Sequence, residues 1–501
     1  MALRIQQRRQ PSGGRSQETP QRQVPPRTVL WLCLGAGFIT LLDQSVFVLA
    51  VPAMAAGLQA DAGQVQWILA SYSLAFGLAL VPAGRLGDLV GRRTLFVAGL
   101  SVFGAFSLLG GLATDPTVVI GARLLQGLGA GALNPQVLGL LQDVHAGAGR
   151  AKALGYYAAA GGTAAVCGPL IGGVILSVGS QEGSWRLLFL VNVPLVLVLV
   201  PLALVFLPRR SRSPAVPGQR RPTIDAVGAL LLGAVVLASL VPTIQGPGPE
   251  TPIWLGSSAV ALAVFAGWEV LYHRRGRTPL LVPALVRSPG YVLGTVVALC
   301  QFGVGAAMAA VTAFYFLAGT GLPPLAAAAI LAPQAAGMLL ASSFSWRFLG
   351  RYGRGGVVWA LVAGLACLPG KDLAVQYLDS GAAAMAVAAV GLLQGLAVGL
   401  VVAPNQTLTL AQAPPGATGV AAGFYQLSQR FTAALCSAAA AGMFLTAGAD
   451  PRRAFHQGVV LCSVLLGVAV LAGSADWLRT AAVAGRQATR RQPSKRRRAG
   501  P

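Results

Sequence analysis

The sequence predicts an all-α integral membrane protein with about 14 transmembrane helices, arranged as two six-helix bundles plus two inserted helices. Of the 501 residues, 55% are hydrophobic and only 10% are charged, whereas soluble domains carry about 25% charged residues. About 14 apolar segments are long enough to cross ~30 Å of hydrocarbon. In addition, short patterns in the first half of the chain return in the second half, as expected for a duplicated bundle.

The apolar segments are separated by short polar turns or by longer basic loops. Most have roughly 17–25 residues, the length of a membrane-spanning helix. They run near 29–51, 66–83, 94–113, 117–140, 153–178, 187–207, 224–243, 253–271, 291–317, 324–346, 356–370, 382–403, 418–446 and 456–475.

The positive charges lie mainly at one face of this arrangement. If the N-terminus is cytoplasmic, 31 of the 37 Lys and Arg residues fall in inner loops and tails. The outer loops then hold only Arg186, Lys371, Arg452 and Arg453. The positive-inside bias therefore predicts that both termini are cytoplasmic. Because basic ends beside a bilayer contact anionic lipid, the net charge of +23 requires no nucleic acid partner.

Changes in composition predict the domain boundaries. The two ends are polar and basic, and a basic, Pro-containing segment divides the two halves. We expect a disordered cytoplasmic tail (1–28), a first six-helix bundle (29–207), a basic linker with two inserted helices (208–290), a second six-helix bundle (291–475) and a basic cytoplasmic tail (476–501).

Two internal repeats support the duplication. The segment Leu124–Gly131 returns as Leu392–Gly399, 268 residues later, and Asp88–Arg92 is echoed by Gly350–Arg354, 262 residues later. The second copies lack the charges of Arg123 and Asp88. We therefore expect the functional charges in the first half.

Two charged residues are predicted inside helices of the first half. Asp43 is the one acidic residue placed well inside the hydrocarbon, where a charge costs roughly 2.5–3.5 kcal/mol on insertion scales. A role in handling protons or substrate is favoured over a protonated, purely structural hydrogen bond. Arg123 lies one turn from Gln126. It has either a functional role or a side chain that snorkels to the interface.

Two glycine-rich stretches complete the candidate sites. The loop Gly84–Leu95 holds three arginines and Asp88 between two apolar segments, so it lies in water at one membrane face. Asp88 and Arg92 are four residues apart and close enough to pair. The stretch Cys167–Gly173 contains Pro169, which bends a helix, and small residues that permit close helix packing.

These patterns together resemble the major facilitator superfamily, and within it the 14-helix drug:proton antiporter branch. Gly84–Leu95 is similar to the signature loop between helices 2 and 3, and Arg123 with Gln126 to the helix 4 signature. The remaining similar segments lie in helices 1, 5, 6 and 8, in the order expected: Leu42–Pro52, Gly168–Gly173, Trp185–Pro194 and Glu269 with Pro279–Leu281. Arg430 departs from the pattern, which usually has a small residue there.

The resemblance implies alternating access, in which two bundles rock about a central site, and it implies roles for particular residues. Proton coupling or substrate contact is expected at Asp43, Arg123 and Gln126. A cytoplasmic gate is expected at Gly84, Asp88, Gly91, Arg92 and Arg93, with Asp88 facing the start of a helix near Thr418. The antiporter motif of helix 5 is expected at Gly168, Pro169, Gly172 and Gly173.

The predicted function is proton-coupled export of a small amphipathic drug or antibiotic, which would confer resistance. No Walker A loop is present, so an ion gradient must supply the energy, and no cofactor or metal is expected. The small number of intramembrane acids favours a neutral, zwitterionic or monocationic substrate. A transporter that exports or takes up a metabolite on the same fold is the main alternative, while a receptor or a membrane-bound enzyme fits the buried charges and scattered histidines less well.

Overall fold

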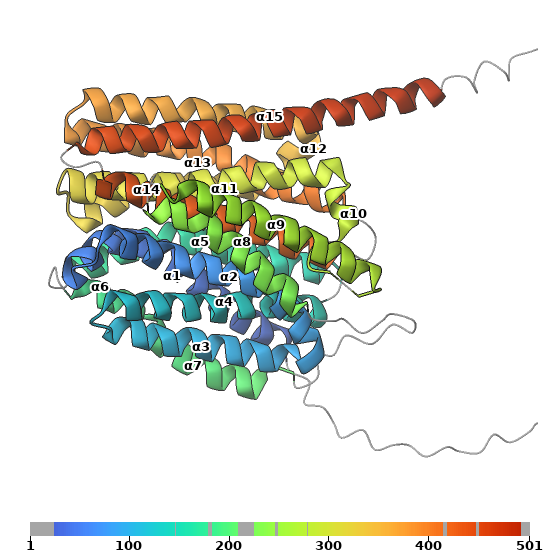
Figure 1. Cartoon of the computed structure of the whole chain (residues 1–501), viewed down its shortest axis with the longest axis horizontal. Helices are drawn as coiled ribbons and strands as arrows, with labels where there is room; N and C mark the ends of the chain where they lie inside the picture. The colour runs from blue at the N-terminus through green and yellow to red at the C-terminus, as the bar shows by residue number, and fades with distance from the viewer. Residues whose placement is uncertain are drawn as a thin grey trace, which may run out of the picture.

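The computed structural model consists of helices that run side by side along one axis (Figure 1). It describes residues 25–145, 147–178, 183–208, 225–245, 249–277, 279–413, 418–446 and 450–491. The helices before the inserted pair are α1 (Pro26–Leu58), α2 (Ala62–Val90), α3 (Arg92–Leu112), α4 (Pro116–Val144), α5 (Gly147–Val178), α6 (Ser184–Leu190) and α7 (Asn192–Phe206). The later ones are α8 (Ala226–Gln245), α9 (Thr251–Arg274), α10 (Pro283–Val286), α11 (Pro289–Phe314), the π-helix Tyr315–Gly319, α12 (Pro324–Tyr377), α13 (Ser380–Leu410), α14 (Thr418–Thr446) and α15 (Pro451–Arg491).

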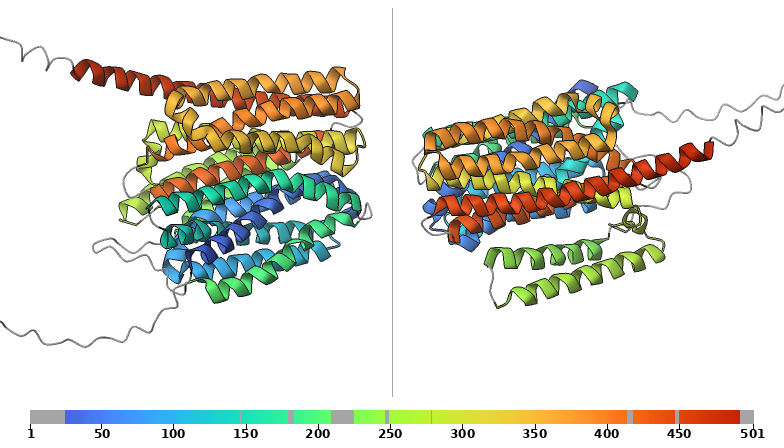
Figure 2. Two further views of the ribbon diagram at one scale, coloured as in Figure 1. Left: turned by 180° about the vertical axis from the view of Figure 1, so that it is seen from behind. Right: turned by 90° about the horizontal axis from the view of Figure 1, so that it is seen from above.

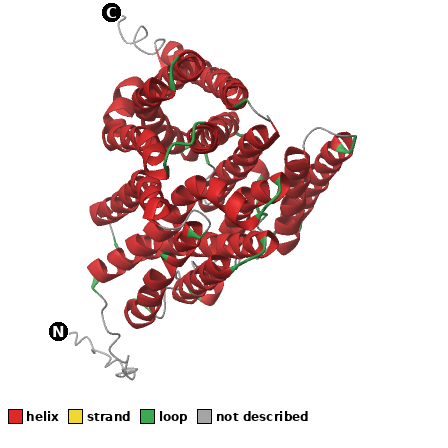
Figure 3. Ribbon diagram, turned by 90° about the vertical axis from the view of Figure 1, so that its left-hand side faces the viewer, coloured by secondary structure: helices red, strands yellow, loops and turns green. Residues whose placement is uncertain are grey.

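The helices form two bundles, which we call the first bundle (α1–α7) and the second bundle (α11–α15). Helices α2, α3 and α4 pack together in the first, and α12 packs along α13 in the second. The bundles meet where α14 packs on α2 and where α12 packs on α5. Helices α8 and α9 lie beside the bundles (Figure 2), and the end-on view shows the side-by-side packing of the long helices (Figure 3). The predicted fold class is therefore confirmed.

Eleven helices within the described ranges are long and apolar enough to cross a membrane. One of them, α12, has 54 residues and joins two helices at Gly353. Both ends of α12 lie near the start of α15, because Gln376 hydrogen-bonds to the Arg452 carbonyl and Pro451 packs on Gly319, shortly before α12 begins. The apolar part of α8 is short, and α14 is not among the eleven. A count of 14 spans therefore stays a prediction, as do the exact domain boundaries.

The sequence repeats correspond to repeated packing. A Cβ added to Gly127 or Gly131 of α4 would overlap the backbone of Tyr72 or Phe76 in α2. In the second bundle, Gly395 and Gly399 of α13 lie in the same way against Gln334 and Met338 of α12. Gly395 and Gly399 follow Gly127 and Gly131 by 268 residues, which is the offset of the first sequence repeat. Gln334 and Met338 follow Tyr72 and Phe76 by 262 residues, which is the offset of the second. Close backbone contact through glycine thus occurs at matching places in both halves.

The turns between repeated helices also correspond. Gly91 separates α2 from α3 with φ +101°, and Gly353 bends α12 with φ +53°. Both values lie in the region that glycine adopts without steric cost. The predicted echo between Asp88–Arg92 and Gly350–Arg354 therefore marks two equivalent turns.

Two helices extend past the ends of the apolar segments in the sequence. Lys371, expected in an outer loop, lies inside α12 and is only 1% exposed, because this helix continues to Tyr377. The last helix does not end at 475 but reaches Arg491, beyond the rest of the molecule (Figure 1). Before this extension, the buried carboxylate of Asp476 forms ion pairs with Arg354 and Arg479. The basic segment 209–224 and the ends 1–24 and 492–501 lie outside the described residues.

The glycine contacts predict a difference between two substitutions. Gly395→Ala should lower the melting temperature of the purified protein, because overpacking a tight contact costs about 1–3 kcal/mol. Gly467→Ala is the control, since a Cβ at this α15 position meets nothing within 4 Å. Equal melting temperatures for the two variants would contradict the predicted α12–α13 contact.

Candidate functional site: a buried ion pair between α1 and α4

Asp43 of α1 and Arg123 of α4 form an ion pair in the interior of the first bundle. Arg123 Nη1 lies 2.6 Å from Asp43 Oδ2, and the two side chains are 3% and 0% exposed. Leaving either charge buried without its partner would cost several kcal/mol. The interpretation in which Arg123 snorkels to the membrane surface is therefore wrong.

Neutral amide groups add hydrogen bonds to this pair. Gln126 Nε2 donates to Asp43 Oδ1 at 3.1 Å, and its Oε1 accepts from Arg123 at 2.8 Å. Asn192 of α7 donates to the same Asp43 Oδ1 at 2.7 Å. Gln126 also donates to Ser107 of α3 at 2.7 Å. Both carboxylate oxygens are thus bonded, and this network of side chains links α1, α3, α4 and α7.

Aromatic rings cover the guanidinium group of Arg123. Its Cζ lies 3.8 Å from the ring centroid of Phe47 and 4.3 Å from that of Tyr72. The Tyr72 hydroxyl donates to the Thr40 carbonyl at 3.0 Å, which fixes the ring. Cation–π contacts in a water-poor interior strengthen the hold on the arginine. The site therefore orients Arg123 firmly towards Asp43.

The carboxylate of Asp43 is the negative charge of this cluster, and it accepts from Arg123, Gln126 and Asn192. Loss of that charge would leave Arg123 with the Gln126 oxygen as its hydrogen-bond acceptor and would remove the ionic link between α1 and α4. The packing of these helices therefore depends on the charge at Asp43.

The sequence identified Asp43, Arg123 and Gln126, which the structure brings together. It missed Asn192, Ser107, Phe47 and Tyr72 as parts of the same site. Asn192 could have been recognised as a candidate, because it is a polar residue near the start of a strongly apolar segment. The aromatic residues offered none, because rings are common in membrane helices.

A second cation lies between the two bundles. Arg430 of α14 donates to Gln44 Oε1 of α1, and its Cζ lies 4.4 Å from the Phe76 ring of α2. Gln44 Nε2 donates to Ser73 Oγ at 3.3 Å. Gln44 directly follows Asp43, so the central ion pair and the interface between the bundles are adjacent.

The loop between α2 and α3 carries its own ion pairs. Asp88 Oδ1 lies 3.3 Å from Arg92 Nη2, as predicted, and Asp143 of α4 lies 3.5 Å from Arg92 Nη1. Arg93 donates to the Leu204 carbonyl of α7. Gly84 packs near Pro135. We call this end of the molecule, where α2 ends and α3 begins, the basic end.

The expected contact of Asp88 with the start of α14 stays a prediction, because residues 414–417 and the side chain of Thr418 lie outside the described residues. A contact not predicted involves Arg85, which donates to the Pro279 carbonyl at 2.6 Å. Nearby, Glu269 accepts from the Leu281 amide at 2.9 Å. The loop is thus joined to the segment that follows α9.

The glycines of α5 permit close contacts with both bundles. A Cβ on Gly168 would overlap Ser45 of α1, and one on Gly172 would lie 3.3 Å from Val46. A Cβ on Gly173 would instead meet the start of α12, 2.8 Å from Ala328 Cβ. Pro169 lies inside α5, within this stretch. The predicted helix 5 motif thus lies where α5 packs between α1 and the second bundle.

Lys371 is a buried cation that the sequence placed in the wrong environment. Its Nζ donates to Gln334 Oε1 at 2.9 Å and lies 3.9 Å from a Cβ placed on Gly391. Gln334 is the counterpart of Tyr72, which covers Arg123 in the first bundle. Each bundle therefore encloses a cation, Arg123 beside the Asp43 carboxylate in the first and Lys371 beside the Gln334 amide in the second.

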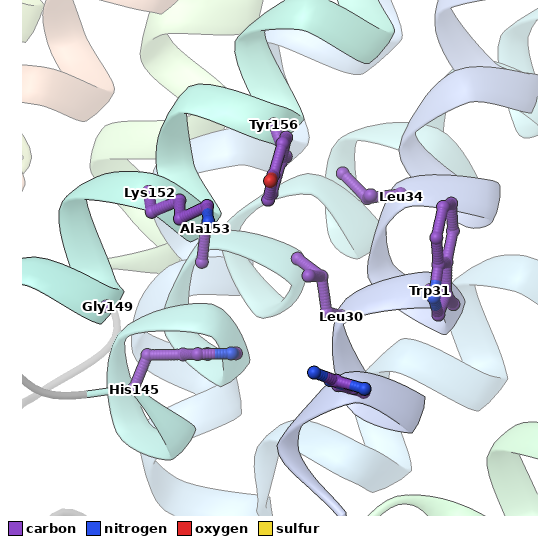
Figure 4. A pocket seen from close by; sticks show the side chains of 9 residues that line it. Leu30, Trp31, Leu34, His145, Gly149, Lys152, Ala153 and Tyr156 are labelled. Carbon is purple, nitrogen blue, oxygen red and sulfur yellow. The ribbon is translucent and has the colours of Figure 1, made fainter.

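A cavity of about 450 Å³ opens near the start of α1. Figure 4 shows Trp31, Leu30 and Leu34 of α1 on one side and Lys152, Ala153 and Tyr156 of α5 on the other. Arg27 and His145 also line it. Its walls are therefore apolar and aromatic, with basic groups, and it lies at the basic end.

The ion pair predicts a non-additive effect on stability. Asp43→Asn should lower the melting temperature of the purified protein, because an unpaired buried charge costs about 3–5 kcal/mol. Adding Arg123→Gln should restore most of the loss, since the cost arises from the remaining charge. Asp61→Asn, at an exposed helix start, is the control. A double variant as unstable as the sum of the single variants would argue against the pair.

Comparisons with known proteins agree with this fold. A family model described as the Major Facilitator Superfamily matches residues 33–437. The chain is 32% identical over 390 residues to a probable actinorhodin transporter of Streptomyces coelicolor, covering 75% of this chain and 66% of that one. It is 31% identical over 423 residues to a puromycin resistance protein of Streptomyces alboniger, covering 81% and 79%.

Solved structures share the arrangement of the helices. A bacterial homologue of the human lysosomal transporter Spinster, in an inward-facing and unoccupied conformation, superimposes with a TM-score of 0.63 at 16% identity, covering 91% of this chain and 98% of that one. A D-xylose–proton symporter gives 0.61 at 15% identity, covering 90% and 97%. With the family match over most of its length, the chain belongs to the major facilitator superfamily and is a multi-pass membrane transporter of small molecules.

Proposed function

We propose that this transporter exports a small amphipathic drug or antibiotic from a bacterial cell in exchange for protons. The observation that carries the proposal is the buried Asp43–Arg123 pair with its amide partners, at the middle of the first bundle. The similarity to proteins named as antibiotic transporters supports the class of substrate. Export would confer resistance, including self-resistance if the cell makes the compound.

The proposed location is the cytoplasmic membrane, with both termini in the cytoplasm. The basic end carries Arg92 and Arg93, and the positive-inside bias favours this end as the cytoplasmic one. The cavity lined by Trp31 and Lys152 would then open towards the cytoplasm. It would give an amphipathic molecule an entrance from the cytoplasm or the inner leaflet.

In the proposed cycle, a proton and the substrate occupy the site in turn. Proton uptake at Asp43 loosens its bonds to Arg123 and Asn192, and the first bundle then moves relative to the second. The glycines of α5 and the contact of α14 with α2 provide surfaces on which the bundles can rock. Asp88 and Arg92 close the basic end in one of the two states.

Transport assays test this cycle directly. Everted vesicles that contain the protein should accumulate an amphipathic drug when a proton gradient is applied, and an uncoupler should abolish the accumulation. Asp43→Asn should abolish it as well, because the site can no longer exchange a proton. Uptake by intact cells in place of export would favour the alternative, a metabolite symporter on the same fold. Transport unaffected by both the uncoupler and Asp43→Asn would contradict proton coupling.

The gate makes a separate prediction. Asp88→Asn should slow transport severalfold while leaving expression and melting temperature unchanged, because Asp88 acts in closing the basic end. Asp143→Asn is the matched control, since it removes the other ion pair of Arg92 within the first bundle. Equal transport rates for the two variants would argue against a specific gating role of Asp88.

A further inference from the structure

Arg430 is a cation of the interior that no carboxylate balances among the described residues. It lies in the middle of α14 and is half-buried. Within the described residues, it donates a hydrogen bond to the neutral side-chain oxygen of Gln44. A guanidinium group has five N–H donors in a planar fork that matches a carboxylate. The bond to Gln44 engages one donor of this fork, and an anionic group could be bound by the others.

The carboxylate of Asp43 is already engaged by other residues. Asp43 adjoins Gln44 in sequence, but its oxygens already accept from Arg123, Gln126 and Asn192. Asp43 and Arg123 cancel in charge, which leaves Arg430 as a net positive charge where the bundles meet. A charge in such surroundings is costly unless an anion joins it.

The surroundings of Arg430 also suit an aromatic molecule. Its guanidinium lies over the Phe76 ring at 4.4 Å, and α14 approaches α2 closely, since a Cβ on Gly77 would lie 3.1 Å from Arg430 Cβ. Gln44 and Ser73 add polar groups beside this ring. The cavity at the basic end combines Arg27 and Lys152 with Trp31 and Tyr156. Cations beside aromatic rings are thus found both at Arg430 and in this cavity.

We propose that Arg430 binds the acidic group of the transported substrate, which is therefore an amphipathic aromatic acid with a carboxylate or an ionised phenol. The proposal rests on the export function for its physiological meaning. It differs from the sequence-based expectation of a neutral, zwitterionic or monocationic substrate. That expectation counted the acids of the membrane interior but not its unbalanced cation.

Binding of two matched probes to the purified full-length protein tests this assignment without any gradient. The probes are anthracene-2-carboxylate and anthracene-2-carboxamide, which differ in charge but share the ring system. The wild type should bind the carboxylate roughly tenfold or more tightly, the range expected for hydrogen bonds to a charged group. Arg430→Gln should remove this preference and leave the Kd of the carboxamide unchanged.

Two further variants keep the test decisive. Arg430→Lys should retain part of the preference for the carboxylate. If Arg430→Gln does not fold, the preference of Arg430→Lys is measured in its place. Arg347→Gln, at an exposed arginine of α12, should retain all of it. A wild type that binds neither probe, or binds both equally, overturns the proposal. So does an Arg430→Gln variant that keeps the preference or that weakens both probes equally, since Arg430 would then only link the bundles.

The export proposal fails by a different observation. If the wild type prefers the carboxylate but its vesicles show no proton-dependent accumulation of either probe, Arg430 binds acids but the protein does not export them by proton exchange. If vesicles export the carboxamide in a proton-dependent way without a preference for the acid, export stands and the assignment of Arg430 falls.

Discussion

The cost of burying charge in a membrane interior constrains this protein more than any other interaction. Asp43 and Arg123 are both almost fully enclosed, so neither tolerates the loss of the other without compensation. Gln126 and Asn192 bind the remaining oxygen of the carboxylate, and Phe47 and Tyr72 cover the guanidinium. The positions of four helices are thereby linked to one protonatable group.

The duplicated fold places this group where it can act. Equivalent glycines hold α4 on α2 and α13 on α12, so each bundle is closely packed within itself. The contacts between the bundles involve fewer helices, chiefly α14 on α2 and α12 on α5. Gln44 connects the central ion pair to the interface between the bundles, because it follows Asp43 in the first bundle and accepts a hydrogen bond from Arg430 of the second. A change at Asp43 is thus one residue from the interface.

An acidic substrate would also alter the energetics of exchange. Each charge that crosses the membrane along the potential gains roughly 2.3 kcal/mol per 100 mV. A proton that enters while a monovalent anion leaves moves two charges in the favourable direction. Exchange for a neutral molecule moves only one. If Arg430 binds an acidic substrate, the membrane potential therefore supplies more free energy for export at the same number of protons exchanged.

Much of this architecture could be predicted from the sequence. Hydropathy, basic loops and the repeats at Leu124–Gly131 and Leu392–Gly399 were sufficient for the fold class, and Asp43, Arg123 and Gln126 stood out as polar residues in apolar segments. Lys371 was misplaced because an apolar segment interrupted by a lysine looks like the end of a helix. The partnership of Asn192 with Asp43 could not be predicted, since it joins residues 149 positions apart through packing alone.

We propose that Asp43 couples proton binding to substrate binding. The most direct measurement is the Kd of the purified protein for an exported compound as a function of pH, with no gradient present. If one proton is displaced by the substrate, the Kd should rise as the pH falls, approaching tenfold per pH unit, and Asp43→Asn should abolish this dependence. A Kd that does not vary with pH, or that varies equally in Asp43→Asn, would contradict the account.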